Sequence, residues 1–329
     1  MAEREFKILL VTGGAGFIGS NFIHYMIRKY PEYKIINLDK LTYAGNLKNL
    51  KDIENNENYR FVRGDICDRN IIEELFSNNK IDAVINFAAE SHVDRSIEDP
   101  GVFIQTDVYG TFVLLEASSK YKAGVFLQIS TDEVYGSIAE GSFKETDPLK
   151  PNSPYAASKA SAEMIVRSFY KTYGTPVLIT RTSNNFGPYQ FPEKIIPLFV
   201  TNLIDGLKVP LYGDGMNVRD WIYVMDNCHA LDLVLHRGEI GQSYNIGGGN
   251  EKPNVWITKT LLKLLEKPQS MIQPVADRLG HDRRYSVDCT KIEKELGWKS
   301  ETDFEEALEK TVKWYLNNEE WWRPLKNRV

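Results

Sequence analysis

The chain has 329 residues, enough for two coupled domains of roughly 100–200 residues each. Its 40 Lys and Arg against 45 Asp and Glu give a formal net charge of −5, which argues against binding of nucleic acid polymers through a basic surface. With 42% hydrophobic and 26% charged residues, the composition excludes a disordered or fibrous chain.

Short apolar runs and helical patterns alternate through the first half of the chain. Strands are expected at 6–12, 34–39, 59–64, 83–88, 125–130 and 176–181, with helices between them, the first over 17–29. This alternation predicts an α/β fold with a Rossmann-like, doubly wound parallel sheet. Beyond about residue 185 the units are shorter and rich in Pro and Gly, with helices near 258–267 and 303–317.

We therefore expect residues 1–185 to form the main domain, and residues 186–329 to form mainly a smaller, mixed α/β C-terminal lobe. The boundary is blurred, because the chain is expected to cross back to the sheet. The main domain would carry the glycine-rich and catalytic motifs described next, and the C-terminal lobe would face the substrate.

Cysteine usage and the N-terminal segment bear on the compartment. Cys67, Cys228 and Cys289 form no CxxC pair, so the sequence predicts neither a disulfide framework nor a metal site. The N-terminal segment lacks the apolar region and cleavage site of a signal peptide, and no run approaches the roughly 18 apolar residues of a membrane span. We expect a cytoplasmic protein that uses no metal and has no membrane partner.

A glycine-rich segment joins the first expected strand to the first helix. Gly13, Gly16 and Gly19 have the spacing that lets a turn approach a pyrophosphate, which the helix N-terminus then faces. Asp39 ends the second strand, where a carboxylate accepts a hydrogen bond from the ribose 2′-hydroxyl and repels a 2′-phosphate. The sequence therefore predicts an NAD site in preference to NADP. Asp65 follows the third strand, where adenine is usually flanked, although an Asp that caps a helix explains it equally well.

A tyrosine and a lysine lie one helical turn apart at the start of a helix that is expected to end near Tyr173. These are Tyr155 and Lys159. A phenol with its ordinary pKa near 10 is a poor base at neutral pH. The lysine ammonium, together with a positive nicotinamide ring, would lower that pKa and make Tyr155 the base for hydride transfer. Taken alone, the pair is also typical of a packed tyrosine beside an exposed lysine.

Three polar residues, Thr131, Asp132 and Glu133, follow the strand that ends at Ser130. The hydroxyl would polarise the substrate oxygen that is oxidised. Hydride transfer does not need two carboxyl groups, and burying both beside a ligand would cost free energy unless proton chemistry uses them. One carboxylate as base and one carboxylic acid as donor would suit elimination of water. An Asp-Glu turn at the surface is the alternative.

The glycine-rich turn and the Tyr155–Lys159 pair resemble those of the extended short-chain dehydrogenase/reductase superfamily that acts on nucleotide sugars, and the resemblance covers essentially all 329 residues. The run from Thr131 to Gly136 is similar to the signature of the dTDP-glucose 4,6-dehydratase family, whereas UDP-galactose 4-epimerases lack this acid pair. The resemblance implies a lyase that uses NAD to convert dTDP-glucose to dTDP-4-keto-6-deoxy-D-glucose, as in dTDP-rhamnose biosynthesis. It also implies a homodimer formed by the helices around 105–120 and 155–173, although core packing explains their apolar stripes equally well.

The resemblance further implies which residues act and which residues bind. The catalytic set is Thr131, Asp132, Glu133, Tyr155 and Lys159. The cofactor-binding set is Gly13, Gly16, Phe17, Ile18, Gly19, Asp39, Lys40, Thr42, Asp65, Ile66, Phe87, Ala88, Ala89, Ser91, Thr106, Tyr155, Lys159 and Asn185. The substrate-binding set is Ser91, Thr131, Asn184, Lys194, Ile195, Pro210, Leu211, Tyr212, Arg219, Asn254, Asp277, Arg278, His281 and Tyr285. Arginines suit a diphosphate and an aromatic ring suits a stacked base. Leu279 stands where the family motif has proline.

Two other functions fit parts of the pattern. A dehydratase or epimerase for another nucleotide sugar, such as GDP-mannose or CDP-glucose, would share much of the catalytic set. A non-catalytic, NAD-sensing binding protein of the same superfamily usually lacks the tyrosine or the lysine, and this chain has both.

Overall fold

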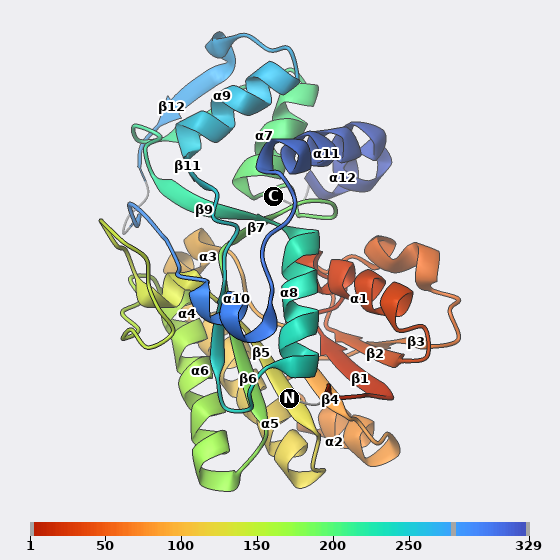
Figure 1. Cartoon of the computed structure of the whole chain (residues 1–329). Coiled ribbons are helices and arrows are strands. Elements are labelled where there is room, and N and C mark those ends of the chain that lie inside the picture. The colour runs from red at the N-terminus through yellow and green to blue at the C-terminus, as the bar shows by residue number, and fades with distance from the viewer. Residues whose placement is uncertain (1–2, 278–280, 327–329) are drawn as a thin grey trace.

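The structure is a computed structural model that describes residues 3–277 and 281–326. The described residues form a central seven-stranded sheet in the order β10-β6-β5-β4-β1-β2-β3, in which every neighbouring pair is parallel (Figure 1). The predicted Rossmann-like sheet is therefore confirmed. Its strands are β1 (Ile8–Thr12), β2 (Lys34–Asp39), β3 (Tyr59–Arg63), β4 (Ala83–Asn86), β5 (Val125–Thr131), β6 (Val177–Thr182) and β10 (Ser243–Ile246).

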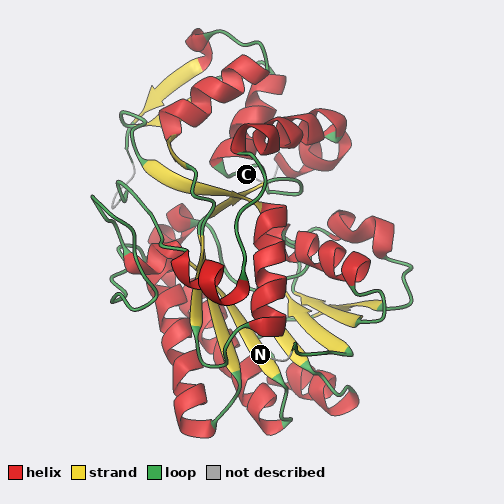
Figure 2. Ribbon diagram, in the orientation of Figure 1, coloured by secondary structure: helices red, strands yellow, loops and turns green. Residues whose placement is uncertain are grey.

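Helices cover both faces of this sheet (Figure 2). Because side chains alternate along a strand, Leu9 and Val11 of β1 pack into the core under one layer and Leu10 packs into the core under the other. The first layer is α1 (Phe17–Lys29), α8 (Val224–Arg237) and α10 (Thr290–Leu296), and the second is α2 (Arg69–Asn78), α5 (Thr111–Lys120) and α6 (Pro154–Tyr173).

Short helical segments connect several of the strands. The helix that was expected over 105–120 is interrupted, because residues 104–110 form a π-helical turn before α5 begins. The short segments are η1 (Leu47–Ile53), α3 (Val93–Glu98), α4 (Pro100–Phe103), η2 (Ile104–Gly110), η3 (Asp132–Tyr135) and η4 (Gln269–Met271).

The second lobe lies beyond the carboxyl ends of the main strands (Figure 1). A three-stranded sheet and a parallel strand pair pack there with four helices around their own apolar core. Its strands are β7 (Asn184–Phe186), β8 (Val209–Tyr212), β9 (Val218–Tyr223), β11 (Glu251–Pro253) and β12 (Ile272–Val275), and its helices are α7 (Ile195–Ile204), α9 (Asn254–Leu264), α11 (Phe304–Asn317) and α12 (Glu319–Lys326). Between these elements the chain returns to the main sheet as α8 and β10, and again as α10.

None of the helices within the described residues is both long enough and apolar enough to traverse a lipid bilayer.

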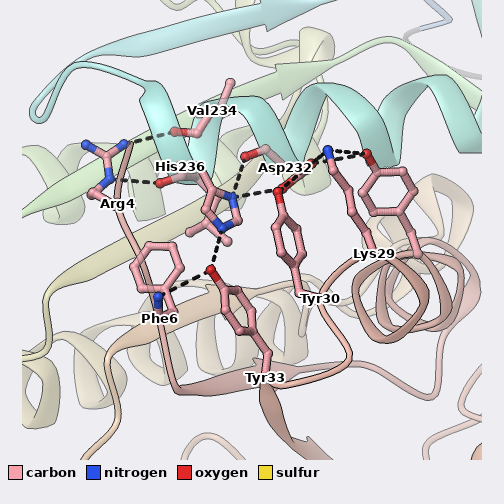
Figure 3. Close-up of polar contacts among 10 residues, drawn as sticks. Arg4, Phe6, Lys29, Tyr30, Tyr33, Asp232, Val234 and His236 are labelled. Carbon is pink, nitrogen blue, oxygen red and sulfur yellow. Dashed lines mark hydrogen bonds and ion pairs between the residues drawn. The ribbon is translucent and has the colours of Figure 1, made fainter. Parts of the chain in front are cut away.

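A buried polar network holds α8 against α1 (Figure 3). The Asp232 carboxylate on α8 accepts hydrogen bonds from Lys29 Nζ at 2.6 Å and Tyr30 Oη at 3.0 Å, and it contacts His236 Nδ1 at 2.8 Å. His236 Nε2 lies 3.1 Å from Tyr33 Oη, which continues the network beyond α1. Burial alone would raise the pKa of Asp232, but the hydrogen bonds from His236 and Lys29 outweigh it and hold the pKa below its usual value.

We expect Asp232→Asn to destabilise the fold by about 1 kcal/mol at pH 7, because the ion pair with Lys29 is lost while the Lys29 side chain, 42% exposed, stays solvated. A carboxyl group with a lowered pKa stabilises the fold above its unfolded pKa of about 4, and that stability is lost as the pH falls further. Urea unfolding at several pH values measures both effects. The wild type should lose more stability on acidification than the variant, whereas the exposed control Glu309→Gln should behave as the wild type. Equal pH dependence of wild type and Asp232→Asn would contradict this account.

Candidate active site

The carboxyl ends of β1, β2, β4, β5 and β6 open into one cavity of about 330 Å³. Parallel strands end together at one edge of a sheet, so loops that are distant in sequence meet there. All of the residues predicted to bind the cofactor line this cavity, and so do the five predicted catalytic residues. Four of the residues predicted to bind substrate also line it: Ser91, Asn184, Lys194 and Thr131, which belongs to the catalytic set as well.

The glycine-rich turn leaves room for a ligand at the start of α1. Gly13 has a φ of +66°, and a Cβ there would lie 2.6 Å from the backbone nitrogen of Ala88. A Cβ at Gly19 would lie 2.5 Å from the Gly13 carbonyl oxygen. Gly16 is the N-cap of α1 and offers no side chain to the first amide groups of the helix. These amides can therefore bind a phosphate, as a dinucleotide site requires.

One acidic residue ends β2 and another follows β3 at the rim of the cavity. Asp39 is buried, and its two oxygens accept hydrogen bonds from Ala15 N at 2.9 Å and Leu41 N at 2.8 Å. Each carboxylate oxygen has a second lone pair, so Asp39 can still accept a hydrogen bond from a ribose hydroxyl. Asp65 pairs with Lys40 at 2.6 Å. The N-cap of α2 is Asp68, which shows that Asp65 is not the cap of that helix.

Tyr155 and Lys159 reach the cavity from the first turns of α6. The Ser153 hydroxyl caps this helix and Pro154 begins it, which fixes where both side chains point. Lys159 is buried and donates to the Ile129 carbonyl at 2.8 Å. Both residues thus belong to the cavity, and the interpretation of Lys159 as an exposed residue is wrong.

Burial dominates the electrostatics of Tyr155 in the chain alone. Burial raises the pKa of its phenol well above 10, the negative charges of Glu133 and Asp107 raise it further, and a hydrogen bond with Thr131 lowers it. Burial also lowers the pKa of the Lys159 ammonium. In the chain alone desolvation dominates, and the lowering of the Tyr155 pKa by Lys159 together with a positive nicotinamide ring stays a prediction.

The acid pair lies on η3, directly after β5. Burial and the charge of Glu133 raise the pKa of Asp132 to about 8, so its carboxyl group holds a proton at neutral pH. Asp132 Oδ1 accepts a hydrogen bond from the Thr131 hydroxyl at 3.1 Å, and its buried Oδ2 has no hydrogen-bond partner among the described residues. Glu133 Oε2 lies 3.4 Å from the Tyr285 hydroxyl. The burial of Asp132 excludes the alternative of an Asp-Glu turn at the surface. The site therefore holds one protonated carboxyl group, Asp132, beside a second carboxyl group, Glu133.

The other residues predicted to bind substrate lie beyond the cavity wall, in the second lobe. The guanidinium of Arg219 stacks on the Tyr285 ring at 4.3 Å and donates to the Asp282 carbonyl at 3.0 Å. The pairing of β8 with β12 brings Tyr212 near His281, with their ring centroids 6.4 Å apart.

Tyr285 joins these residues to Glu133, while Arg278 lies outside the described residues. The residues beyond the wall are Ile195, Pro210, Leu211, Tyr212, Arg219, Asn254, Asp277, His281 and Tyr285.

Two buried carboxyl groups at the site were missed by the sequence reasoning. Asp107, on the π-helical turn, accepts hydrogen bonds from Glu90 N at 2.9 Å and Ser158 Oγ at 2.6 Å, and burial raises its pKa to about 6. Glu193 accepts a hydrogen bond from Tyr43 Oη at 3.0 Å. An acidic residue inside the apolar pattern around 104–115 was a signal for Asp107, whereas no local pattern marks Glu193.

A doubly wound sheet with a dinucleotide turn, a Tyr–Lys pair and a buried acid pair defines the class of this protein as an extended short-chain dehydrogenase/reductase. Residues 10–311 match the family described as GDP-mannose 4,6 dehydratase. A dTDP-glucose 4,6-dehydratase of Streptomyces antibioticus is 52% identical, over 97% of this chain and 96% of that protein. The chain therefore belongs to this family, and within it to the branch of the dTDP-glucose 4,6-dehydratases.

Solved structures agree with this assignment. The dTDP-glucose 4,6-dehydratase DesIV of Streptomyces venezuelae, crystallised with NAD and TYD bound, superposes with a TM-score of 0.94 at 51% identity, covering 97% of this chain and 99% of that one. A dTDP-glucose 4,6-dehydratase of Bacillus anthracis in complex with NAD gives a TM-score of 0.91 at 52% identity, with the same coverage. A UDP-glucose 4-epimerase of Thermotoga maritima is more distant, with a TM-score of 0.87 at 32% identity over 94% of this chain and 99% of that one.

The raised pKa of Asp132 can be tested without substrate. A protonated carboxyl group gives an infrared carbonyl band, so we expect a band that is present well below pH 8, is lost well above it, and is absent from Asp132→Asn. In Glu133→Gln the same band should disappear at a lower pH, because the neighbouring negative charge has been removed. No such band below pH 8 in the wild type would contradict the assignment.

Proposed function

We propose that the chain converts dTDP-D-glucose to dTDP-4-keto-6-deoxy-D-glucose and water. The observation that carries this proposal is the pair Asp132 and Glu133, one carboxyl group protonated and both beside Tyr155 in one cavity. A 4-epimerase needs no such pair. The full-length similarity to dTDP-glucose 4,6-dehydratases supports the same reaction.

The cavity fits NAD. The Gly13–Gly19 turn and the uncapped amides of α1 suit the pyrophosphate of NAD. Asp39 suits the adenosine ribose of NAD, and its carboxylate would repel the 2′-phosphate that NADP carries at the same position. Asp65 and Ile66 flank the adenine position, and Tyr155 and Lys159 reach the nicotinamide end. When bound, NAD+ accepts the C4 hydride and returns it to C6 within one turnover, and its positive ring lowers the pKa of the Tyr155 phenol.

The oxidation step uses residues at the ends of β5 and α6. Tyr155 removes the proton of the C4 hydroxyl, and Thr131, which hydrogen-bonds Tyr155, orients and polarises the same oxygen. Lys159, held by the Ile129 carbonyl, supplies the positive charge that favours the phenolate.

The elimination step uses the acid pair. The C4 ketone acidifies the C5 hydrogen, which Glu133 removes as a base. Asp132 donates its proton to the departing C6 hydroxyl, and water leaves. Glu133 then returns its proton to C5 as C6 is reduced. Tyr155 releases the proton that it took from the C4 hydroxyl, and Asp132 takes one up, which restores the site. The net change is the loss of one water molecule, and the redox balance is zero.

The second lobe holds the nucleotide. Arg219 suits the diphosphate, because its guanidinium is held in place by the Tyr285 ring. Tyr212 suits the base, because its ring is exposed and can stack on the base. Asn254 has a buried Oδ1 with no hydrogen-bond partner among the described residues, so it can accept a hydrogen bond from a ligand.

Incubating the purified protein with dTDP-glucose should yield the 4-keto-6-deoxy product, identified by mass spectrometry. The same assay with UDP-glucose and GDP-mannose measures nucleotide specificity. No product, or conversion only to dTDP-galactose, would refute the proposed reaction.

Glu133→Gln should block elimination while it leaves the C4 oxidation partly intact. NADH absorbance should then build up on addition of dTDP-glucose, and product formation should fall by roughly 10²–10⁴-fold. Tyr155→Phe is the matched control, because it removes the base of the first step and should give neither NADH nor product. A Glu133→Gln variant that turns over at the wild-type rate would contradict the assigned base.

We also propose that the protein is a homodimer. Its second helical layer and the segments before it expose Ile97, Val102, Ile104, Met164 and Tyr173, with Ile104 60% exposed. Apolar side chains gathered on neighbouring elements favour a subunit interface.

Sedimentation of the wild type should show a dimer, and Ile104→Asp should convert that dimer to a monomer. The control Leu207→Asp changes an exposed apolar residue of the second lobe and should leave the dimer intact. A monomeric wild type would refute the interface.

The proposed location is the cytoplasm, because Cys67, Cys228 and Cys289 are free thiols, as is usual in a reducing compartment. Cell fractionation should recover the activity with cytoplasmic enzymes, and recovery in a secreted fraction would refute the location.

A further inference from the structure

Helix α12 contacts a segment of the main domain that supports the glycine-rich turn. Trp321 on α12 is buried, and its indole N–H donates a hydrogen bond to Asn49 Oδ1 at 2.8 Å. Asn49 lies on η1, and its Nδ2 donates to the carbonyl of Ala15 at 3.0 Å. Two hydrogen bonds thus join residue 321 to the turn between β1 and α1. Neither Trp321 nor Asn49 is among the described residues that line the cavity.

The peptide groups of Ala15 are held from both sides. Its N–H donates to Asp39, and its carbonyl accepts a hydrogen bond from Asn46 N at 2.9 Å as well as the one from Asn49. Ala15 therefore links Asp39, which suits the ribose, to the glycine-rich turn, which suits the pyrophosphate. A turn that is already fixed loses little conformational entropy when a ligand binds.

Trp321 determines how the Asn49 amide is oriented. With Oδ1 facing the indole N–H, Nδ2 must face Ala15. Asn49 is 1% exposed, so without the indole donor its Oδ1 would be a buried acceptor with no hydrogen bond, or the amide would rotate and lose Ala15.

We propose that Trp321 is a positioning residue for the cofactor: by orienting Asn49 it preorganises the glycine-rich turn and slows the release of NAD+. The inference rests on the proposed function for the identity of the cofactor. Trp321 does not touch the cofactor and acts through Asn49 and Ala15.

Two neighbouring tryptophans provide a matched test. Trp321→Phe removes the indole N–H but keeps an aromatic ring against Trp314 and Tyr189, whose centroids lie 5.0 and 5.9 Å away. Trp322→Phe also removes a buried indole N–H, but this one donates to the Tyr315 carbonyl on α11. Bound NAD+ in each holoenzyme is exchanged against radiolabelled NAD+, without any nucleotide sugar present.

Trp321→Phe should release NAD+ roughly tenfold faster than the wild type, and Trp322→Phe at the wild-type rate, although both melt at lower temperature. At saturating NAD+ the turnover of Trp321→Phe should stay close to that of the wild type. Equal release rates for the two variants would overturn the inference.

Asn49→Ala provides a second, independent variant, which also applies if Trp321→Phe does not fold. It removes the bond to Ala15 directly and should release NAD+ at least as fast as Trp321→Phe. If Trp321 acts through Asn49, adding Trp321→Phe to Asn49→Ala should not speed release further. Additive effects, or wild-type release from Asn49→Ala, would overturn the inference. A wild type that holds NAD+ but yields no dehydratase product would refute the proposed reaction alone, since the exchange experiment involves no sugar substrate.

Discussion

Desolvation of ionisable groups at the carboxyl edge of the sheet is the physical effect on which the chemistry of this protein depends. Strands β2, β5 and β6 deliver the polar residues Asp39, Thr131 and Thr182 to that edge, and the helices and second lobe close over it. Burial disfavours charge, so a carboxylic acid at Asp132 and a neutral phenol at Tyr155 are the favoured forms. A raised pKa therefore favours Asp132 as a proton donor and disfavours Tyr155 as a proton acceptor. In the protein alone, Asp132 is in the protonated form that the proposed reaction needs, whereas Tyr155 is not in the phenolate form.

The architecture separates the two binding tasks by lobe. In the proposed function, backbone amides and the Asp39 carboxylate would bind the dinucleotide in the main domain, whereas side chains on β8, β9 and the segment around Tyr285 would bind the nucleotide sugar. A net charge of −5 is compatible with two phosphate-bearing ligands, because helix N-termini and a few local arginines suffice for a diphosphate.

The sequence was most informative where function depends on local spacing. The glycine turn, the Tyr155–Lys159 pair and the run after β5 are each contained in a few residues, and their strands are short apolar runs with clear ends. Features that depend on tertiary contacts could not be predicted. The edge strand β10, the burial that sets the pKa of Tyr155, and the contact of Trp321 with Asn49 each join segments far apart in the chain. The π-helical turn at Asp107 is likewise set by its bonds to Glu90 and Ser158.

The path of the chain has a consequence for how the gene can be divided. After entering the second lobe the chain returns as α8 and β10, so an edge strand of the main sheet and much of its first helical layer are encoded downstream of residue 220. A fragment that ends at residue 185 would lack α8, which packs on β6, and would therefore expose Leu178 and the edge of β6. The two lobes are therefore interleaved rather than modular, and recombination between relatives would have to exchange both together.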